Sequence, residues 1–251
     1  MTVRIERIAS FDGAELAVHR LGKGRPVVLL HGLFSSAEMN WIRFGHAAKL
    51  AEAGFEAIMP DLRAHGESAA PHDPAAYPPD VLVRDLDAVV RACAPAAFDL
   101  AGFSLGARTA ASGVIAGLRP RRLVLGGVGL ESLSNWDARA AFFVDAIDRF
   151  DAIRMGDPAY FTVQFMKTMK IDRVAAHLLL TRGVDDPPLD GLAGITTPTL
   201  VLCGEQDRDN GSPEALARAL PDARYETVPG SHMSSVTEPA LGEAIVRFLS
   251  M

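Results

Sequence analysis

Hydrophobic and polar residues alternate in the first part of the chain and then give way to continuous hydrophobic runs. Residues 2–8 and 15–21 alternate with a period of two, which predicts two half-buried strands. Asp12-Gly13 between them suits a hairpin turn. Residues 26–30 are hydrophobic throughout, as expected of a strand buried on both faces of a parallel sheet. The sequence therefore predicts an antiparallel edge followed by parallel strands.

Strands and helices then alternate along the chain. Helix-type residues over 37–53 end at Gly54, which suits a helix C-terminus, and another hydrophobic run follows at 55–59. The alternation continues through helix 81–93, strand 98–101, helix 104–118, strand 123–128, strand 199–203, helix 213–220, strand 224–228 and helix 239–249. This order predicts the α/β class, with a mostly parallel central sheet and helices on both faces.

The alternation stops between residues 131 and 190. Three helix-like stretches occupy this segment, at residues 136–150, 159–169 and 171–182. Because no convincing strand lies among them, we interpret residues 131–190 as a small helical cap inserted over the active site. Residues 1–130 and 191–251 then form the α/β core.

Charge and composition exclude several classes of function. The chain has 25 Lys and Arg against 31 Asp and Glu, a net charge of −6, so we expect neither a nucleic-acid nor a membrane partner. No hydrophobic run approaches the roughly 20 residues of a membrane span, and residues 1–11 lack the core of a secretory signal. Cys93 and Cys203 form no metal or redox motif, so we expect buried thiols in a reducing compartment. These features predict a cytoplasmic protein without metal or cofactor. We expect a monomer or a homodimer, and the sequence does not decide between the two.

A Gly-x-Ser-x-Gly motif joins strand 98–101 to the following helix. In Gly102-Phe103-Ser104-Leu105-Gly106 the glycines permit a sharp turn that holds the serine hydroxyl at the end of the strand. This position suits a nucleophile.

A histidine and a carboxylate follow other predicted strands. Asp207 comes shortly after strand 199–203, and His232 shortly after strand 224–228. Parallel strands end at one edge of their sheet, where ligands of open α/β folds bind. A serine nucleophile needs a base within hydrogen-bond reach, and the base needs a carboxylate that orients it. Ser104, His232 and Asp207 supply these three groups.

The chain order serine, aspartate, histidine is the order of α/β-hydrolases, and the sequence resembles that superfamily over essentially its whole length. Besides the serine motif, the matching segments are His31-Gly32, Asp61-Leu62-Arg63-Ala64-His65-Gly66-Glu67-Ser68, Gly204-Glu205-Gln206-Asp207, and Gly230-Ser231-His232 with Glu238-Pro239. The resemblance implies the α/β-hydrolase fold. It also implies an oxyanion hole formed by the backbone N–H groups of Leu33 and Leu105.

Some residues at this edge allow more than one interpretation. Asp209 could also reach the histidine, but Asp207 holds the superfamily's position after Gly204, so we interpret Asp209 as a turn residue beside Asn210-Gly211. Ala64 stands where the superfamily often has glycine. Four other polar residues are interpreted as structural groups that order the loops: His31, Arg63, His65 and Ser68.

The cap and the neighbouring loops supply the predicted substrate pocket. Its candidate residues are Phe34, Phe103, Phe142, Phe143, Phe165 and Met166. For each of them the alternative is packing of the cap against the core, because hydrophobic residues at helical spacing are core by default. Since the cap has no cluster of Arg or Lys, we predict a small to medium hydrophobic substrate. Ser104, His232 and Asp207 predict that this substrate is a carboxylic ester, which is cleaved through an acyl-enzyme. Thioester or lactone cleavage, perhydrolysis and carbon–carbon hydrolysis would use the same three groups. A protein that senses a small molecule with little turnover is the alternative from another class.

Overall fold

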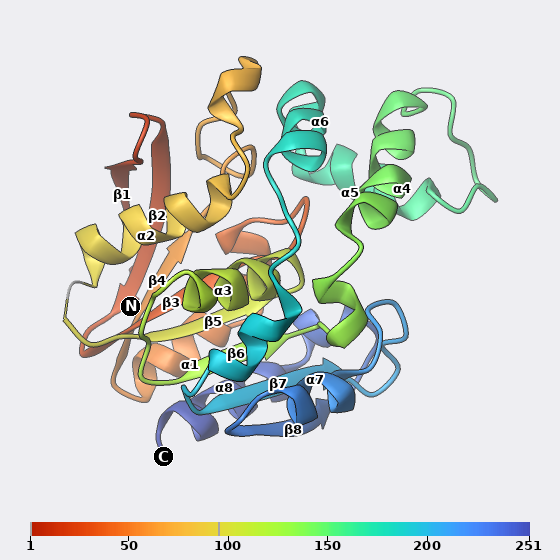
Figure 1. Ribbon diagram of the computed structural model, residues 1–251. Helices are drawn as coiled ribbons and strands as arrows, with labels where there is room; N and C mark the ends of the chain where they lie inside the picture. The colour runs from red at the N-terminus through yellow and green to blue at the C-terminus, as the bar shows by residue number, and fades with distance from the viewer. Residues whose placement is uncertain (1, 95) are drawn as a thin grey trace.

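The computed structural model describes residues 2–94 and 96–251. In this part of the chain, eight strands form one sheet in the order β1-β2-β4-β3-β5-β6-β7-β8 (Figure 1). The strands are β1 (Arg4–Ala9), β2 (Glu15–Gly22), β3 (Arg25–Leu30), β4 (Phe55–Pro60), β5 (Asp99–Phe103), β6 (Leu123–Gly126), β7 (Thr199–Gly204) and β8 (Ala223–Val228). β2 pairs antiparallel with β1 and β4, and the remaining neighbours pair in parallel. The predicted antiparallel edge and parallel sheet are confirmed.

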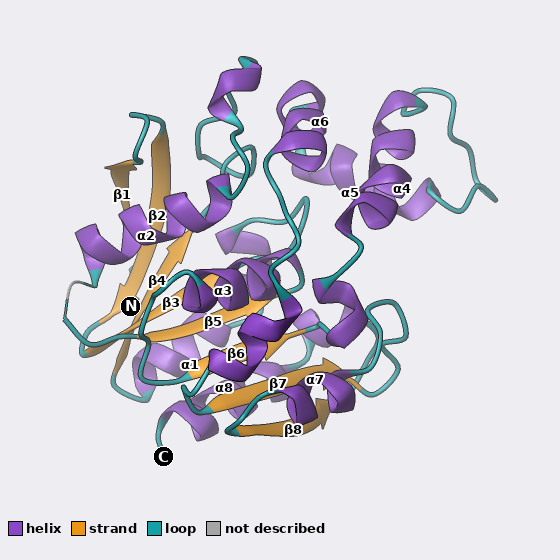
Figure 2. Ribbon diagram, in the orientation of Figure 1, coloured by secondary structure: helices purple, strands orange, loops and turns teal. Residues whose placement is uncertain are grey.

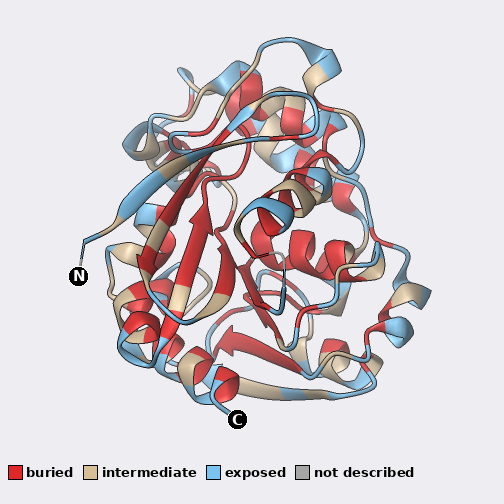
Figure 3. Ribbon diagram, turned by 90° about the vertical axis from the view of Figure 1, so that its left-hand side faces the viewer, coloured by how far each residue is buried: buried red, intermediate tan, exposed pale blue. Residues whose placement is uncertain are grey.

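Helices cover both faces of the sheet (Figure 2). The helices are α2 (Val81–Cys93), α3 (Leu105–Ile115) and α7 (Pro213–Ala219) on one face, and α1 (His46–Glu52) and α8 (Pro239–Leu249) on the other. Val28 and Leu30 of β3 pack with α2 and α3, whereas Val27 and Leu29 pack with α1 and α8. Alternate side chains thus enter two cores, which explains the uninterrupted hydrophobic run. Figure 3 shows the inner strands buried and the N-terminal strand exposed.

The segment 131–190 contains the three predicted helices. They are α4 (Trp136–Asp148), α5 (Tyr160–Met169) and α6 (Arg173–Arg182), which lie in a group beyond the sheet (Figure 1). Their buried residues, Val163 and Leu179 among them, join the hydrophobic cluster that covers α2 and α3. That the segment is a unit of its own stays a prediction. Among the described helices, none has the length and hydrophobicity needed to cross a bilayer.

Short turns of 3₁₀ or π type complete the described elements. They are η1 (Glu38–Ile42), η2 (Pro74–Ala76), η3 (Leu130–Leu133), η4 (Leu189–Gly194) and η5 (Ser234–Thr237). The turns η3 and η4 lie at the two ends of the cap segment. Of the two free cysteines, Cys203 is buried as predicted, but Cys93, the last residue of α2, is only half-buried.

The single helix predicted over residues 37–53 is wrong. The structure has the π turn η1 and the α-helix α1, separated by Gly45 with φ of 81°. A residue in the left-handed region cannot continue a right-handed helix, and glycine adopts it without strain. The break lets Asn40 of η1 accept a hydrogen bond from Gly32 N at 3.1 Å. Helix-type composition alone does not reveal this interruption.

Gly102 and Gly106 allow β5, α3 and β3 to approach closely. A Cβ atom on Gly102 would lie 2.2 Å from the carbonyl oxygen of Gly106. A Cβ atom on Gly106 would lie 2.3 Å from the carbonyl oxygen of Leu30. Both obstacles are backbone atoms, which cannot rotate away as a side chain can. Packing of the sheet against α3 therefore requires both glycines.

Gly102→Ala should lower the free energy of unfolding by about 3 kcal/mol, because the added methyl group overlaps backbone atoms. This value is at the upper end of the typical cost of overpacking a protein core. Denaturant unfolding would measure the change. Gly194→Ala is the control, since a Cβ there would meet nothing within 4 Å. It should change stability by less than about 1 kcal/mol. Equal stability of the two variants would contradict the packing requirement.

Candidate active site

Ser104 occupies the turn between β5 and α3 in a rare backbone conformation. Its φ is 54° and its ψ is −115°, a region in which a Cβ atom is crowded. Its N–H donates to Gly126 O of β6 at 2.8 Å, and its C=O accepts from Arg108 N of α3 at 3.0 Å. Strain of this kind persists only where the surroundings determine the conformation. Here β5, β6 and α3 together fix the serine.

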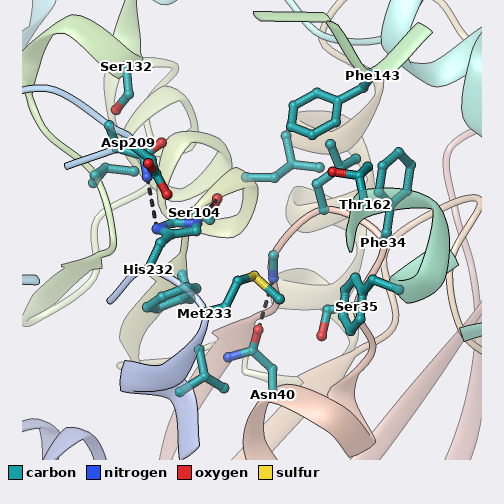
Figure 4. A pocket seen from close by; sticks show the side chains of 18 of the residues that line it. Phe34, Ser35, Asn40, Ser104, Ser132, Phe143, Thr162, Asp209, His232 and Met233 are labelled. Atoms are coloured by element: carbon teal, nitrogen blue, oxygen red, sulfur yellow. Dashed lines mark hydrogen bonds between the residues drawn. The ribbon is translucent and has the colours of Figure 1, made fainter. Parts of the chain in front are cut away.

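The structure brings Ser104, Asp207 and His232 together. His232 Nε2 lies 3.1 Å from Ser104 Oγ, and His232 Nδ1 lies 2.8 Å from Asp207 Oδ2. Figure 4 shows His232 beside Ser104. The side chain of Asp207 is only 3% exposed. With its proton on Nδ1, the imidazole can donate to Asp207 and accept the serine proton at Nε2.

Asp207, and not Asp209, carries the carboxylate that contacts the histidine. Among the described residues the side chain of Asp209 makes no hydrogen bond to His232, and its backbone N–H donates to Asp207 Oδ1 at 3.1 Å. Burial would raise the pKa of Asp207, but the hydrogen bond and charge of His232, with the donors of Asp209 and Asn210, lower that pKa overall. Asp207 is therefore ionised at neutral pH and can stabilise an imidazolium.

Asn210 contacts this pair although the sequence indicated only a turn at its position. Its Nδ2 lies 2.8 Å from His232 Nδ1 and 3.5 Å from Asp207 Oδ1, and the residue is 4% exposed. Since Nδ1 keeps its proton for Asp207, the favourable contact of the amide is the one with Asp207 Oδ1. Asn210 Oδ1 in turn accepts from Arg139 Nη2 of α4 at 2.6 Å. No motif signals this residue; only its spacing of three from Asp207 hints at it.

Two buried histidines hold the loop that follows β3. His31 Nε2 accepts from Leu62 N at 2.9 Å, so its proton is on Nδ1, which donates to Gly32 O at 2.8 Å. His65 Nε2 accepts from Phe34 N at 2.9 Å. Burial lowers the pKa of both histidines, and that of His65 falls to about 3. Both rings are neutral at neutral pH, and their contacts agree with the predicted structural roles.

The 61–68 segment fixes these loops to the edge strands. Ser68 Oγ donates to Asp61 O at 2.6 Å and accepts from Ala17 N of β2 at 2.9 Å. Arg63 is fully buried and pairs with Asp85 at 2.8 Å and with Asp12 at 2.6 Å. Ala64 has φ of 66°, which explains why glycine suits this position in the superfamily. These residues brace the site without touching Ser104.

The two predicted oxyanion donors border the same cavity as Ser104. Leu105 is the first residue of α3, so its N–H has no acceptor within the helix. Among the hydrogen bonds of residues 2–94 and 96–251, none uses the N–H of Leu33. Both groups are therefore available to a ligand.

A cavity of about 730 Å³ lies between Ser104 and the cap segment. Five of the predicted pocket residues line it: Phe34, Phe103, Phe142, Phe143 and Phe165. Figure 4 shows Phe34 and Phe143 on one side of Ser104, and Ser132, Asp209 and His232 on the other. Met166 does not line the cavity, so its assignment to the pocket is wrong and the alternative of packing is correct. Its side chain is 1% exposed and packs inside the hydrophobic cluster of the cap, because it lies on the inner face of α5.

Comparison with known families identifies the fold. The sequence model of the alpha/beta hydrolase family matches residues 27–242. The chain belongs to the alpha/beta hydrolase family. An epoxide hydrolase from Caballeronia sordidicola is 34% identical to it over 111 residues, which are 44% of this chain and 32% of that relative. The chain thus covers less than half of the relative's length.

Solved structures of similar shape include other alpha/beta hydrolases. An esterase from Exiguobacterium antarcticum has a TM-score of 0.79 and 22% identity, with 98% of this chain and 99% of that one covered. The enol-lactonase from Burkholderia xenovorans has a TM-score of 0.77 and 21% identity, with 98% of this chain and 100% of that one covered. At these identities the similarity confirms the predicted fold and leaves the substrate open.

The neutral histidines of this alpha/beta hydrolase predict a loss of stability in acid. Below pH 6.5 the unfolded chain protonates His65, but the native chain does so only near pH 3. The contribution of His65 is therefore complete above pH 6.5 and decreases as the pH falls towards 3. At pH 5 the loss amounts to about 2 kcal/mol.

His65→Gln retains an acceptor for Phe34 N and removes the titration. Its unfolding free energy, measured in urea, should decrease less steeply between pH 7 and 5 than that of the wild type. His72→Gln, at a side chain that is 58% exposed, should keep the wild-type slope. Identical slopes for all three proteins would show that His65 does not contribute.

Proposed function

We propose that this alpha/beta hydrolase cleaves carboxylic esters through an acyl-enzyme intermediate. The observation that carries the proposal is the continuous contact from Ser104 Oγ through His232 to Asp207, at 3.1 and 2.8 Å, on the wall of the cavity. A serine hydroxyl becomes an effective nucleophile when an adjacent imidazole accepts its proton. The imidazole is oriented for this by a carboxylate on its other nitrogen.

The reaction divides into two acyl transfers. Ser104 Oγ attacks the carbonyl carbon while His232 Nε2 takes the hydroxyl proton, and the tetrahedral intermediate expels the alcohol, which receives that proton. Water, deprotonated by the same nitrogen, then attacks the acyl-enzyme and releases the acid. The N–H groups of Leu33 and Leu105 would bind the oxyanion in both steps, and such donors contribute about 10²–10³ in rate each.

The nucleophile favours acyl transfer over epoxide opening, the activity named for the partial relative. If Ser104 attacked an epoxide carbon, the product would be an ether between the serine and the opened substrate. An ether has no carbonyl carbon for water to attack, so the enzyme would stay alkylated. An ester of Ser104 has that carbon and can be hydrolysed. The residue at position 104 thus supports ester cleavage.

The cavity supports a small to medium substrate. Its volume of about 730 Å³ lies within the range of about 300–1,000 Å³ typical of small-molecule sites. Phe142 and Phe143 contact each other edge to face at 5.3 Å between ring centroids, and Phe34 meets Phe143 at 5.7 Å. These rings offer a hydrophobic surface to an acyl or alcohol chain. The partner that we propose is accordingly a small-molecule ester with a hydrophobic group on its acyl or alcohol side.

Ser104→Ala should lower kcat/KM for short-chain 4-nitrophenyl esters by about 10⁴-fold or more, because the nucleophile is lost. Ser112→Ala, at a serine of the same helix that does not line this cavity, is the matched control. Pre-steady-state release of nitrophenol should show a burst, which reports the acyl-enzyme. Equal turnover by wild type and Ser104→Ala would exclude Ser104 as nucleophile. A phosphonate adduct at Ser104 without turnover of any ester would favour the sensing alternative.

Asp207→Asn should reduce kcat by about 10³–10⁴-fold, because the imidazole loses the acceptor that orients it. The reduction in kcat caused by Asp209→Asn should be at least about a hundredfold smaller than that caused by Asp207→Asn, since the Asp209 carboxylate does not contact the imidazole ring. Stopped-flow and steady-state assays on one neutral ester would compare the two variants. A larger loss at position 209 would assign the carboxylate role to Asp209 instead.

A further inference from the structure

The cavity wall contains two arginines that ester hydrolysis itself does not use. Arg108 belongs to α3, one turn beyond Ser104, and Arg139 belongs to α4 of the cap segment. Both line the cavity. The sequence analysis found no cluster of Arg or Lys in the cap, because α3 and the cap meet only in the folded chain.

Arg139 has no carboxylate partner in the described part of the chain. Its Nη1 donates to the backbone oxygen of Asp209 at 3.1 Å and its Nη2 to the amide oxygen of Asn210 at 2.6 Å, and both acceptors are neutral. No carboxylate oxygen among these residues lies within 4.0 Å of a guanidinium nitrogen of Arg139, the distance that defines an ion pair. A guanidinium has five N–H donors, so three of those of Arg139 have no acceptor among the described residues. Burial lowers the pKa of Arg139, and the carboxylates of Asp209 and Asp207 only partly oppose this.

Arg108 adds a second positive charge to the same wall. It is 3% exposed, pairs with Asp186, and donates to Ser132 O at 2.6 Å. Its Nε is buried and has no acceptor among the described residues. Burial lowers the pKa of Arg108, the Asp186 carboxylate opposes the change, and the charge of Arg139 adds to it. Of the two arginines that line the cavity, Arg108 is thus paired with a carboxylate, whereas Arg139 forms no ion pair among the described residues.

We propose that Arg139, supported by the charge of Arg108, binds a carboxylate group carried by the ester substrate. This inference rests on the ester hydrolysis proposed above and narrows its substrate. A guanidinium and a carboxylate match as planar groups that share two parallel hydrogen bonds. Because the guanidinium of Arg139 forms no ion pair among the described residues, it can pair with one carboxylate of a ligand. The substrate class is therefore a half-ester of a dicarboxylic acid, or an ester of a carboxylated alcohol.

The two sides of the cavity agree with a substrate of this shape. Figure 4 shows Ser104 between the aromatic rings of Phe34 and Phe143 on one side and Ser132 and Asp209 on the other. Arg139 bonds to the backbone of Asp209, so it lies on the polar side. An ester whose carbonyl reaches Ser104 can place a hydrophobic group among the rings and a carboxylate near the guanidinium. Asp209, an acidic residue of this wall, is exposed, so its charge opposes the binding of a carboxylate only in part.

The experiment compares 4-nitrophenyl esters of matched length, the half-ester of glutaric acid and the ester of pentanoic acid. The ratio of their kcat/KM values isolates recognition of the carboxylate, because any disturbance of His232 through Asn210 lowers both values together. Arg139→Gln should reduce the ratio of anionic to neutral ester about tenfold, and Arg139→Lys should reduce it less. The ratio of kcat/KM for 4-acetoxybenzoate to that for phenyl acetate tests in the same way whether a carboxylate on the alcohol side is recognised.

A second variant tests whether the charge near Arg139 determines the ratio, and a third serves as its control. Asp209→Asn removes the acidic group beside Arg139 and should raise the ratio about threefold. Arg149→Gln, at a cap arginine paired with Asp145 and Asp157, should leave the ratio unchanged. Higher ionic strength should lower the ratio of the wild type more than that of Arg139→Gln.

The outcomes separate this inference from the proposed function. If Ser104-dependent hydrolysis occurs but both ester pairs give the same ratio in wild type and Arg139→Gln, the carboxylate site is overturned and ester hydrolysis stands. If no ester is turned over, calorimetry still tests the site: monomethyl glutarate is titrated into Ser104→Ala and into the double variant Ser104→Ala/Arg139→Gln. Loss of binding in the double variant supports the carboxylate site, and equal binding by the two proteins overturns it.

Discussion

Close contact of backbone with backbone at the start of α3 is the constraint on which the site depends. Gly102 and Gly106 leave no room for a Cβ atom between β5, α3 and β3. This packing holds Ser104 in a conformation that a free chain would avoid. The same turn leaves the N–H of Leu105 without an acceptor in the helix and places Arg108 on the cavity wall. One steric arrangement thus positions a hydroxyl, a donor and a charge.

The loops around the serine are held by polar side chains in place of regular secondary structure. On one side, His31 and His65 accept backbone N–H groups, which requires that both rings stay neutral. On the other side, Asp207 and Asn210 surround Nδ1 of His232, and Asn210 connects through Arg139 to the cap. The floor of the cavity is therefore fixed by the core, whereas its polar wall depends on where α4 lies.

Family membership and specificity come from different parts of the molecule. The sheet and its loops define an alpha/beta hydrolase, a family whose members differ in reaction and substrate. In the proposed function, a serine at the turn restricts the chemistry that can turn over, because its acyl derivative can be hydrolysed and its ether cannot. The aromatic rings and the two arginines that line the cavity would restrict the substrate further.

The sequence by itself determined the strands of the sheet and its antiparallel edge, because hydrophobic periodicity is a local property of the chain. It also singled out Ser104 and His232 by their places after predicted strands, and Asp207 over Asp209 by the resemblance to the superfamily. It did not determine the break at Gly45, since one left-handed residue leaves composition unchanged. Nor did it decide whether Met166 packs inside the cap or lines the pocket, or place Asn210 beside His232 and Arg139 beside Asn210. Those positions depend on which faces of separate elements meet, and only tertiary packing decides that.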